Sequence, residues 1–129
     1  MLSRTWRFDA VPECVAGARH AVTEYAVAHS VPEPPLEDLR LAVSEAVTNA
    51  VVHAFRHGNP GTITIDVAIE DGTATVSVTD DGVGIGPRPD SPGLGMGLPL
   101  MSTLADAIEV GKAAAGNGTA VRMRFGWAG

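Results

Sequence analysis

The sequence predicts an α+β fold: a two-layer sandwich in which helices cover one face of a mixed, mostly antiparallel β-sheet. The first observation is the order of patterns along the chain. Stretches with apolar residues at helical spacing and stretches with strand-like alternation follow one another as strand, two helices, two strands, helix, two strands. The second is length: 129 residues suffice for one hydrophobic core, so we expect a single domain over residues 1–129.

The first half of the chain predicts one strand and two helices. Residues 4–10, "RTWRFDA", alternate in the manner of an edge strand. Apolar residues then recur at helical spacing over 15–28, and the prolines of "VPEPP" at 31–35 end that helix. A second helix follows with acidic residues in its first turn, which suits the helix dipole, and we expect it to run to about Phe55.

The second half predicts a hairpin, a helix and two further strands. Residues 62–69 and 73–79 alternate with period two on either side of a short turn, which indicates a β-hairpin. Residues 98–105 have helical spacing and predict a third helix. Residues 107–110 and 120–125 predict the last two strands.

Composition excludes several classes of partner and location. The chain has 9 basic and 15 acidic residues, a net charge of −6, which argues against a nucleic-acid partner. The single cysteine, Cys14, excludes an internal disulfide and fits a reducing compartment. Apolar runs are too short for a membrane span, and the first residues lack a signal-peptide core. We therefore expect a cytoplasmic protein without a membrane partner.

Glu45 and Asn49 are polar residues in an otherwise almost apolar second helix. Their i,i+4 spacing puts them on one face of that helix. Such a pair is most often part of a solvated stripe, and that interpretation stays open here. Leu41 and Val52 lie close to the same stripe, however, and a helix this apolar rarely has a broad polar face. A carboxylate and an amide in a partly apolar cleft suit a general base and a metal ligand.

Two glycine-rich segments flank a short connection. "SVTDDGVGIG" (77–86) ends a strand in two acids and three spaced glycines, and "PGLGMGL" (92–98) leads into the third predicted helix. An ordinary Asp-Gly turn would explain the first segment alone. Together, the two segments indicate backbone that approaches a ligand closely, most often a phosphate.

A phosphate site in this chain would have to work without a phosphate-loop lysine. The one lysine, Lys112, lies outside both glycine-rich segments, and neither segment fits a P-loop or a dinucleotide-binding loop. Phosphate charge would therefore be met by backbone N–H groups, a helix N-terminus and a divalent cation.

The histidines and the cysteine are weaker candidates. His20, His29 and His57 lack the spacing of acids or cysteines that a metal site needs. His53, one turn after Asn49, is the histidine placed to face the same pocket. We interpret Cys14 as a small packed side chain rather than a nucleophile.

Four ordered motifs resemble those of a known superfamily. "SEAVTNAVVHAF" (44–55), "DDGVGI" (80–85), "GLGMGL" (93–98) and "GNGT" (116–119) are similar to the N, G1, G2 and G3 boxes of the GHKL ATPase/kinase superfamily, which has the Bergerat ATP-binding fold. Within it, the chain resembles the stand-alone anti-sigma-factor serine kinases of bacterial stress and sporulation switches. Glu45 distinguishes it from sensor histidine kinases, which usually have Asn or His at that position and bring a helical dimerisation domain.

The resemblance implies roles for individual residues. Asn49 would ligate Mg²⁺ that bridges the nucleotide phosphates, and Asp80 would accept a hydrogen bond from the adenine amino group. Glu45 would be the general base toward the incoming serine hydroxyl, and Arg19 would contact the sigma factor. The implied nucleotide-binding residues are Asn49, His53, Asp80, Gly82, Gly84, Ile85, Gly93, Gly95, Met96, Gly97, Leu98 and Thr119.

The function implied is a Mg-ATP-dependent protein serine/threonine kinase that is also an anti-sigma factor. Its partners would be a sigma factor and an anti-anti-sigma antagonist that it phosphorylates, and it would form a homodimer. One alternative is a module of the same fold that binds ATP or ADP and a partner without phosphotransfer, which the short, proline-rich "PRPDSP" (87–92) between the glycines favours. Another is a relative that acts on a partner outside transcription.

Overall fold

The computed structural model describes residues 2–56, 61–81, 98–112 and 118–127, without the side chains of 53–56 and 98. Within these residues five strands form one sheet in the order β1-β2-β3-β5-β4. The strands are β1 (Leu2–Asp9), β2 (Thr62–Glu70), β3 (Thr73–Asp80), β4 (Ala107–Lys112) and β5 (Thr119–Gly126). The helices are α1 (Cys14–Ala28), α2 (Pro35–Arg56) and α4 (Leu98–Leu104).

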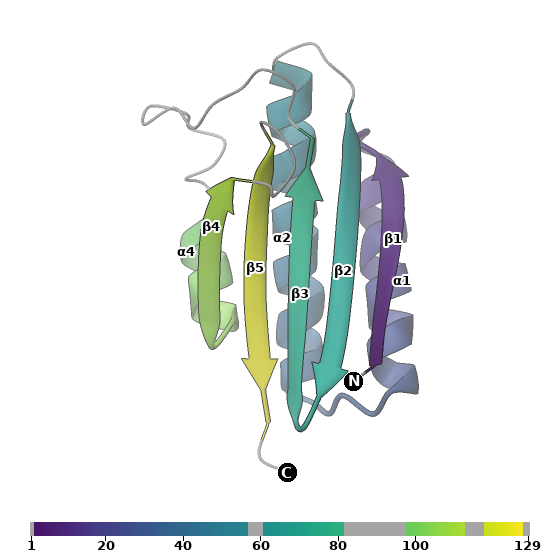
Figure 1. Ribbon diagram of the computed structural model, residues 1–129, viewed down its shortest axis with the longest axis vertical. Coiled ribbons are helices and arrows are strands. Elements are labelled where there is room, and N and C mark those ends of the chain that lie inside the picture. The colour runs from purple at the N-terminus through teal and green to yellow at the C-terminus, as the bar shows by residue number, and fades with distance from the viewer. Residues whose placement is uncertain (1, 57–60, 82–97, 113–117, 128–129) are drawn as a thin grey trace.

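The helices cover one face of the sheet, with α1 behind the β1 edge, α2 behind the centre and α4 behind β4 (Figure 1). The core lies between the two layers because strand residues at every second position face the helices. In β2 these residues are isoleucines and a valine that are at most 7% exposed, while the alternate residues are threonines, alanine and acids. The largest fully buried side chains are Leu39, Ile63, Ile65, Met101, Met123, Val22, Val43, Val47, Val67 and Val76.

A two-residue turn joins β2 to β3. Glu70 pairs with Thr73, and the residues between them, Asp71 and Gly72, have φ of 48° and 75°. Positive φ at both central positions is the conformation of the hairpin turn that Asp-Gly favours. The predicted hairpin is therefore confirmed, together with the chemical reason for its turn.

The α+β sandwich predicted from the sequence is confirmed, but the sheet is antiparallel at all four pairings of the described strands rather than mixed. After β3 the chain passes through α4 and enters β4, which runs in the same direction as β3 (Figure 1). A parallel pair does not form because β5 turns back and lies between β3 and β4.

Two strands are longer than their sequence patterns predicted. The first begins at Leu2 rather than Arg4, because its pairing with β2 continues to the register pair Leu2–Ile69. The fourth runs to Lys112 rather than ending at Val110, because Gly111 and Lys112 still pair with β5.

Candidate functional site

Helix α2 carries Glu45 and Asn49 on the side that faces away from the core. Both side chains are half-buried and lie one helical turn apart. Leu41 and Val52, on the same stripe, are 42% and 43% exposed. The buried face is formed by the residues Leu39, Ala42, Val43, Ala46, Val47, Ala50 and Val51. The stripe therefore joins a carboxylate and an amide to two accessible apolar side chains.

Asp80 ends β3 on the face that the helices cover. Its register partner in β2 is Ile63, which is fully buried, so both residues belong to the inner face. The Asp80 side chain is half-buried. Its carboxylate Oδ1 accepts a hydrogen bond from the backbone N–H of Thr119, with N···O 3.3 Å. The structure thus brings together two residues that are far apart in the sequence.

Gly118 allows β5 to begin directly against the end of β3. A Cβ at Gly118 would lie 2.8 Å from the carbonyl carbon of Asp80 and 3.1 Å from the Cα of Asp81. It would lie nearer still to the carbonyl oxygen of Asp80. Since these are backbone atoms, they have little freedom to move aside. The glycine before Thr119 is therefore required by close approach of two strands.

Asp81 joins the same end of β3 to β2. Its carboxylate Oδ1 accepts a hydrogen bond from the Thr62 N–H at 2.9 Å, and its own N–H donates to the Thr62 carbonyl at 3.3 Å. Of the two adjacent acids, one therefore connects β3 to β5 and the other connects β3 to β2. This leaves the acids in defined positions at the end of the central strand.

The C-terminal end of α2 lies at the end of the sheet where β3 stops and β5 starts (Figure 1). Asn49 belongs to that half of α2, so it and the Asp80–Thr119 pair lie toward the same end of the molecule. His53 continues α2 by one turn at this end, and its side chain is outside the described residues. The site is thus formed by one helix and the ends of two strands.

The remaining candidates for nucleotide binding stay predictions. Leu98 is the first residue of α4, and its side chain is not described. Those that lie outside the described residues are Gly82, Gly84, Ile85, Gly93, Gly95, Met96 and Gly97.

Arg19 lies on α1, apart from the end of β3. It is half-exposed, and its backbone carbonyl accepts a hydrogen bond from the Thr23 hydroxyl at 2.7 Å. On the same helix His20 pairs with Glu24 at 2.7 Å. Arg19 is therefore on a surface separate from the candidate site, and its role as a partner contact stays a prediction.

Cys14 is packed in the core, as the sequence indicated. It is 8% exposed, and burial raises the pKa of its thiol. A thiol with a raised pKa is a poor nucleophile at neutral pH because the thiolate is the reactive form.

Lys112 is the residue that sequence reasoning missed. It ends β4 directly opposite Thr119 in the register, so the chain's one lysine lies at the same end of the sheet as Asp80. Sequence reasoning excludes Lys112 from the phosphate site because it lies outside both glycine-rich segments. The signal that could have found it is the cross-strand pairing of the last two strands, which sequence spacing alone does not define.

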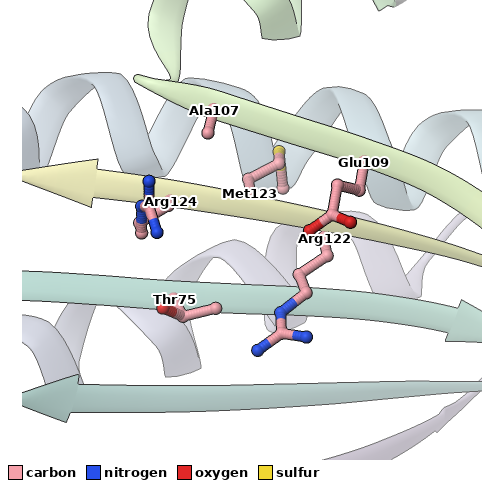
Figure 2. Close-up of a pocket in the computed structure, with 6 residues that line it drawn as sticks. All are labelled: Thr75, Ala107, Glu109, Arg122, Met123 and Arg124. Atoms are coloured by element: carbon pink, nitrogen blue, oxygen red, sulfur yellow. The ribbon is translucent and has the colours of Figure 1, made fainter.

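A hollow of about 330 Å³ lies on the opposite face of the sheet from the helices. Glu109, Arg122 and Arg124 project from this outer face (Figure 2). The residues that line the hollow are Thr75, Ala107, Glu109, Arg122, Met123 and Arg124. None of them belongs to the site predicted from the sequence, so this hollow and the candidate site are separate features.

Residues 8–125 match the family model described as "Histidine kinase-like ATPase domain". The match spans most of the chain and includes α2, β3 and β5. The chain belongs to this family. Membership in a family of ATPase domains implies ATP binding.

The relatives found by sequence are bacterial regulators. An anti-sigma F factor of Clostridium beijerinckii is 34% identical over 128 residues, which cover 91% of this chain and 89% of the relative. An anti-sigma F factor of Clostridium botulinum (strain Eklund 17B) is 36% identical over 120 residues, which cover 84% of this chain and 83% of the relative. An anti-sigma F factor of Geobacillus stearothermophilus is 30% identical over 129 residues, which cover 92% of this chain and 88% of the relative.

A solved structure shares the fold of this chain. It contains the RsbU and RsbW domains of a Mycobacterium tuberculosis protein and aligns with a TM-score of 0.74 at 20% identity. The alignment covers 97% of this chain and 32% of the crystallised chain, so this chain spans about a third of that protein. The described residues contain no helix that is long and apolar enough to cross a membrane.

Proposed function

We propose that this protein is an anti-sigma factor of the partner-switching type with Mg-ATP-dependent protein serine/threonine kinase activity. It would sequester a sigma factor in the cytoplasm and phosphorylate an anti-anti-sigma antagonist. Two comparisons support the proposal. Relatives that are covered over 83% to 89% of their own length carry the name anti-sigma F factor. The fold is also that of a structure that contains an RsbW domain.

The observation that carries the kinase activity is the placement of Glu45 relative to Asn49. Both are half-buried and one turn apart on α2, beside apolar residues, and Asn49 lies in the half of α2 toward the end of the sheet that holds Asp80. A general base needs hydrogen-bond reach to the hydroxyl that it deprotonates, and a partly apolar surface admits a substrate serine. Among the acidic residues of the candidate site, Glu45 is the one that lies next to Asn49, the proposed metal ligand.

The donor set fits magnesium bound through a nucleotide. The described residues contain no group of three or more His, Cys, Asp or Glu close enough to enclose a metal. Mg²⁺ needs no such group, because it usually keeps several waters and uses one or two protein ligands together with substrate phosphates. The side-chain oxygen of Asn49 would serve as such a ligand, as the resemblance implies.

Each site residue has a defined task under this proposal. Bound Mg-ATP supplies the phosphoryl group and neutralises charge on the phosphates. Asp80 accepts a hydrogen bond from the adenine amino group, which is compatible with the Thr119 contact because a carboxylate has about four acceptor positions. Glu45 accepts the proton of the substrate serine hydroxyl. Positioning of these groups, rather than covalent chemistry by the protein, then provides most of the rate enhancement.

The test is phosphotransfer to candidate antagonists encoded near this protein's gene, using labelled ATP. Glu45→Gln should lower the rate by about 10²–10⁴-fold, the usual contribution of a positioned base, while ATP affinity stays unchanged. Glu109→Gln is the matched control, since it removes the same charge from the outer face of the sheet. Normal phosphorylation by the Glu45 variant would remove Glu45 from the mechanism.

A module that binds nucleotide and partner without phosphotransfer is the second candidate. It is favoured by the three prolines in the six residues 87–92 that separate the glycine segments, where a stiff connection would limit closure over a nucleotide. Under this function the wild-type protein binds ATP but phosphorylates none of the antagonists. The same experiment therefore separates the two functions.

We also propose a homodimer. β1 is an edge strand of the sheet, so one side of its backbone is not paired within the described strands. Such an edge can join a second copy of the chain.

A further inference from the structure

Lys112 lies on the face of the sheet that the helices cover. Val110, two residues earlier in β4, pairs with Val121, which is buried on that face. Because residues at alternate positions of a strand share a face, Lys112 and its partner Thr119 belong to the same inner face. The N–H of Thr119 in turn donates to the carboxylate of Asp80. One strand therefore separates the chain's lysine from the end of β3.

The inner face is open at this end of β4. Ile108, near the start of the strand, is partly buried against the core, whereas Val110 is 42% exposed and Lys112 is exposed. The ion pairs of the described residues are His20–Glu24 and Glu37–Arg40, so Lys112 has no carboxylate partner among them. As far as the described residues go, its ammonium group is consequently available to a ligand at this end of the sheet.

The charges around the candidate site call for a cation. Glu45, Asp80 and Asp81 are all acidic, and Lys112 is the one basic side chain described on the inner face at this end. A polyphosphate bound among carboxylates is repelled by them unless positive charge is close. A lysine ammonium on a flexible four-carbon stem suits contact with phosphate.

We infer that Lys112 binds the phosphate groups of the nucleotide, an inference that rests on the proposed ATP site. Neighbouring strands lie about 4.8 Å apart, so the backbones of Lys112 and Asp80 are separated by about 10 Å. A nucleotide that places its base at Asp80, together with the lysine stem, spans this gap. Lys112 then supplies the positive charge that the glycine-rich segments lack.

The test compares the affinities of adenosine, Mg-ADP and Mg-ATP by isothermal titration calorimetry. Lys112→Met should weaken Mg-ATP binding about three- to tenfold, Mg-ADP less, and adenosine not at all, because only the phosphates contact the lysine. Lys112→Arg should retain most of the affinity. The loss in the Met variant should shrink as salt rises, since the contact is solvent-exposed.

Arg122→Met is the matched control for net charge. Arg122 is exposed on the outer face of the neighbouring strand, so its removal changes the charge equally without touching the inner face. We expect less than a twofold effect on any of the three ligands. Thermal melts should show all variants folded, because neither side chain is buried.

The outcomes separate this inference from the proposed function. If the wild type binds Mg-ATP but Lys112→Met behaves like Arg122→Met, or weakens adenosine as much as Mg-ATP, the role of Lys112 is wrong and the nucleotide site stands. If the wild type binds none of the three ligands, the proposed ATP site is wrong and the inference falls with it.

Discussion

Gly118→Ala should destabilise the protein and disturb the candidate site at once. The added Cβ would lie 2.8 Å from the carbonyl carbon of Asp80 and 3.1 Å from the Cα of Asp81, whereas unstrained carbon contacts are about 3.5–4.0 Å. The end of β3 and the start of β5 would have to separate by at least ~1 Å, because the Asp80 carbonyl oxygen lies nearer still to the added Cβ. The Thr119–Asp80 hydrogen bond, already 3.3 Å long, would not survive that movement.

The expected cost follows from overpacking a close-packed contact, about 1–3 kcal/mol in the free energy of unfolding. For a domain of this size each kcal/mol corresponds to roughly 3–6 °C in Tm, so the melting temperature should fall by about 3–18 °C. ATP affinity should fall as well, because the Asp80 carboxylate moves with its backbone. Circular-dichroism melts and calorimetry measure the two effects.

Gly111→Ala is the control, because a Cβ at Gly111 in β4 would meet no atom within 4 Å. The same chemical change there should alter the free energy of unfolding by no more than about 1 kcal/mol in either direction. If Gly118→Ala melts at the same temperature as Gly111→Ala and binds ATP normally, the close approach of β3 and β5 described above is wrong.

Three further predictions concern the site and the assembly. Asp80→Asn should weaken ATP more than GTP in competitive binding, because an amide can present a donor to the adenine amino group; equal loss for both would make Asp80 structural. Asn49→Ala should lose most Mg-dependent ATP binding, and full affinity in that variant or in excess chelator would contradict its role as a metal ligand. Light scattering at micromolar concentration should give the mass of a dimer, and a monomer mass would refute pairing through the β1 edge.

The sequence predicted the elements well because their signals are local. Helix α2 shows its buried face as a repeat of apolar residues at helical spacing, and the strands of the hairpin alternate cleanly. Asp71 and Gly72 form the turn between these two strands, and Asp-Gly is a sequence that favours this type of turn. Patterns of this kind are fixed by residues within a few positions of one another.

The arrangement of the sheet was harder to predict from the sequence because it depends on contacts between residues that are far apart along the chain. No local signal shows that β5 lies between β3 and β4, and the sequence therefore predicted a mixed, mostly antiparallel sheet where every described pairing is antiparallel. The same pairing places Lys112 opposite Thr119 and both near Asp80. The motifs identified Asp80 and Thr119 through resemblance, whereas Lys112 belongs to none of the four motifs and emerged from the register alone.

The central claim is that adenine nucleotide binds at the end of the sheet formed by β3 and β5, beside the exposed stripe of α2. A titration of ¹⁵N-labelled protein with Mg-ATP tests it most directly. The backbone amides of Asn49, Asp80 and Thr119 should shift together along one saturable curve, while those of Thr75 and Arg124, at the hollow on the outer face, stay in place. Shifts centred on Thr75 and Arg124, or no shifts at millimolar nucleotide, would contradict the claim.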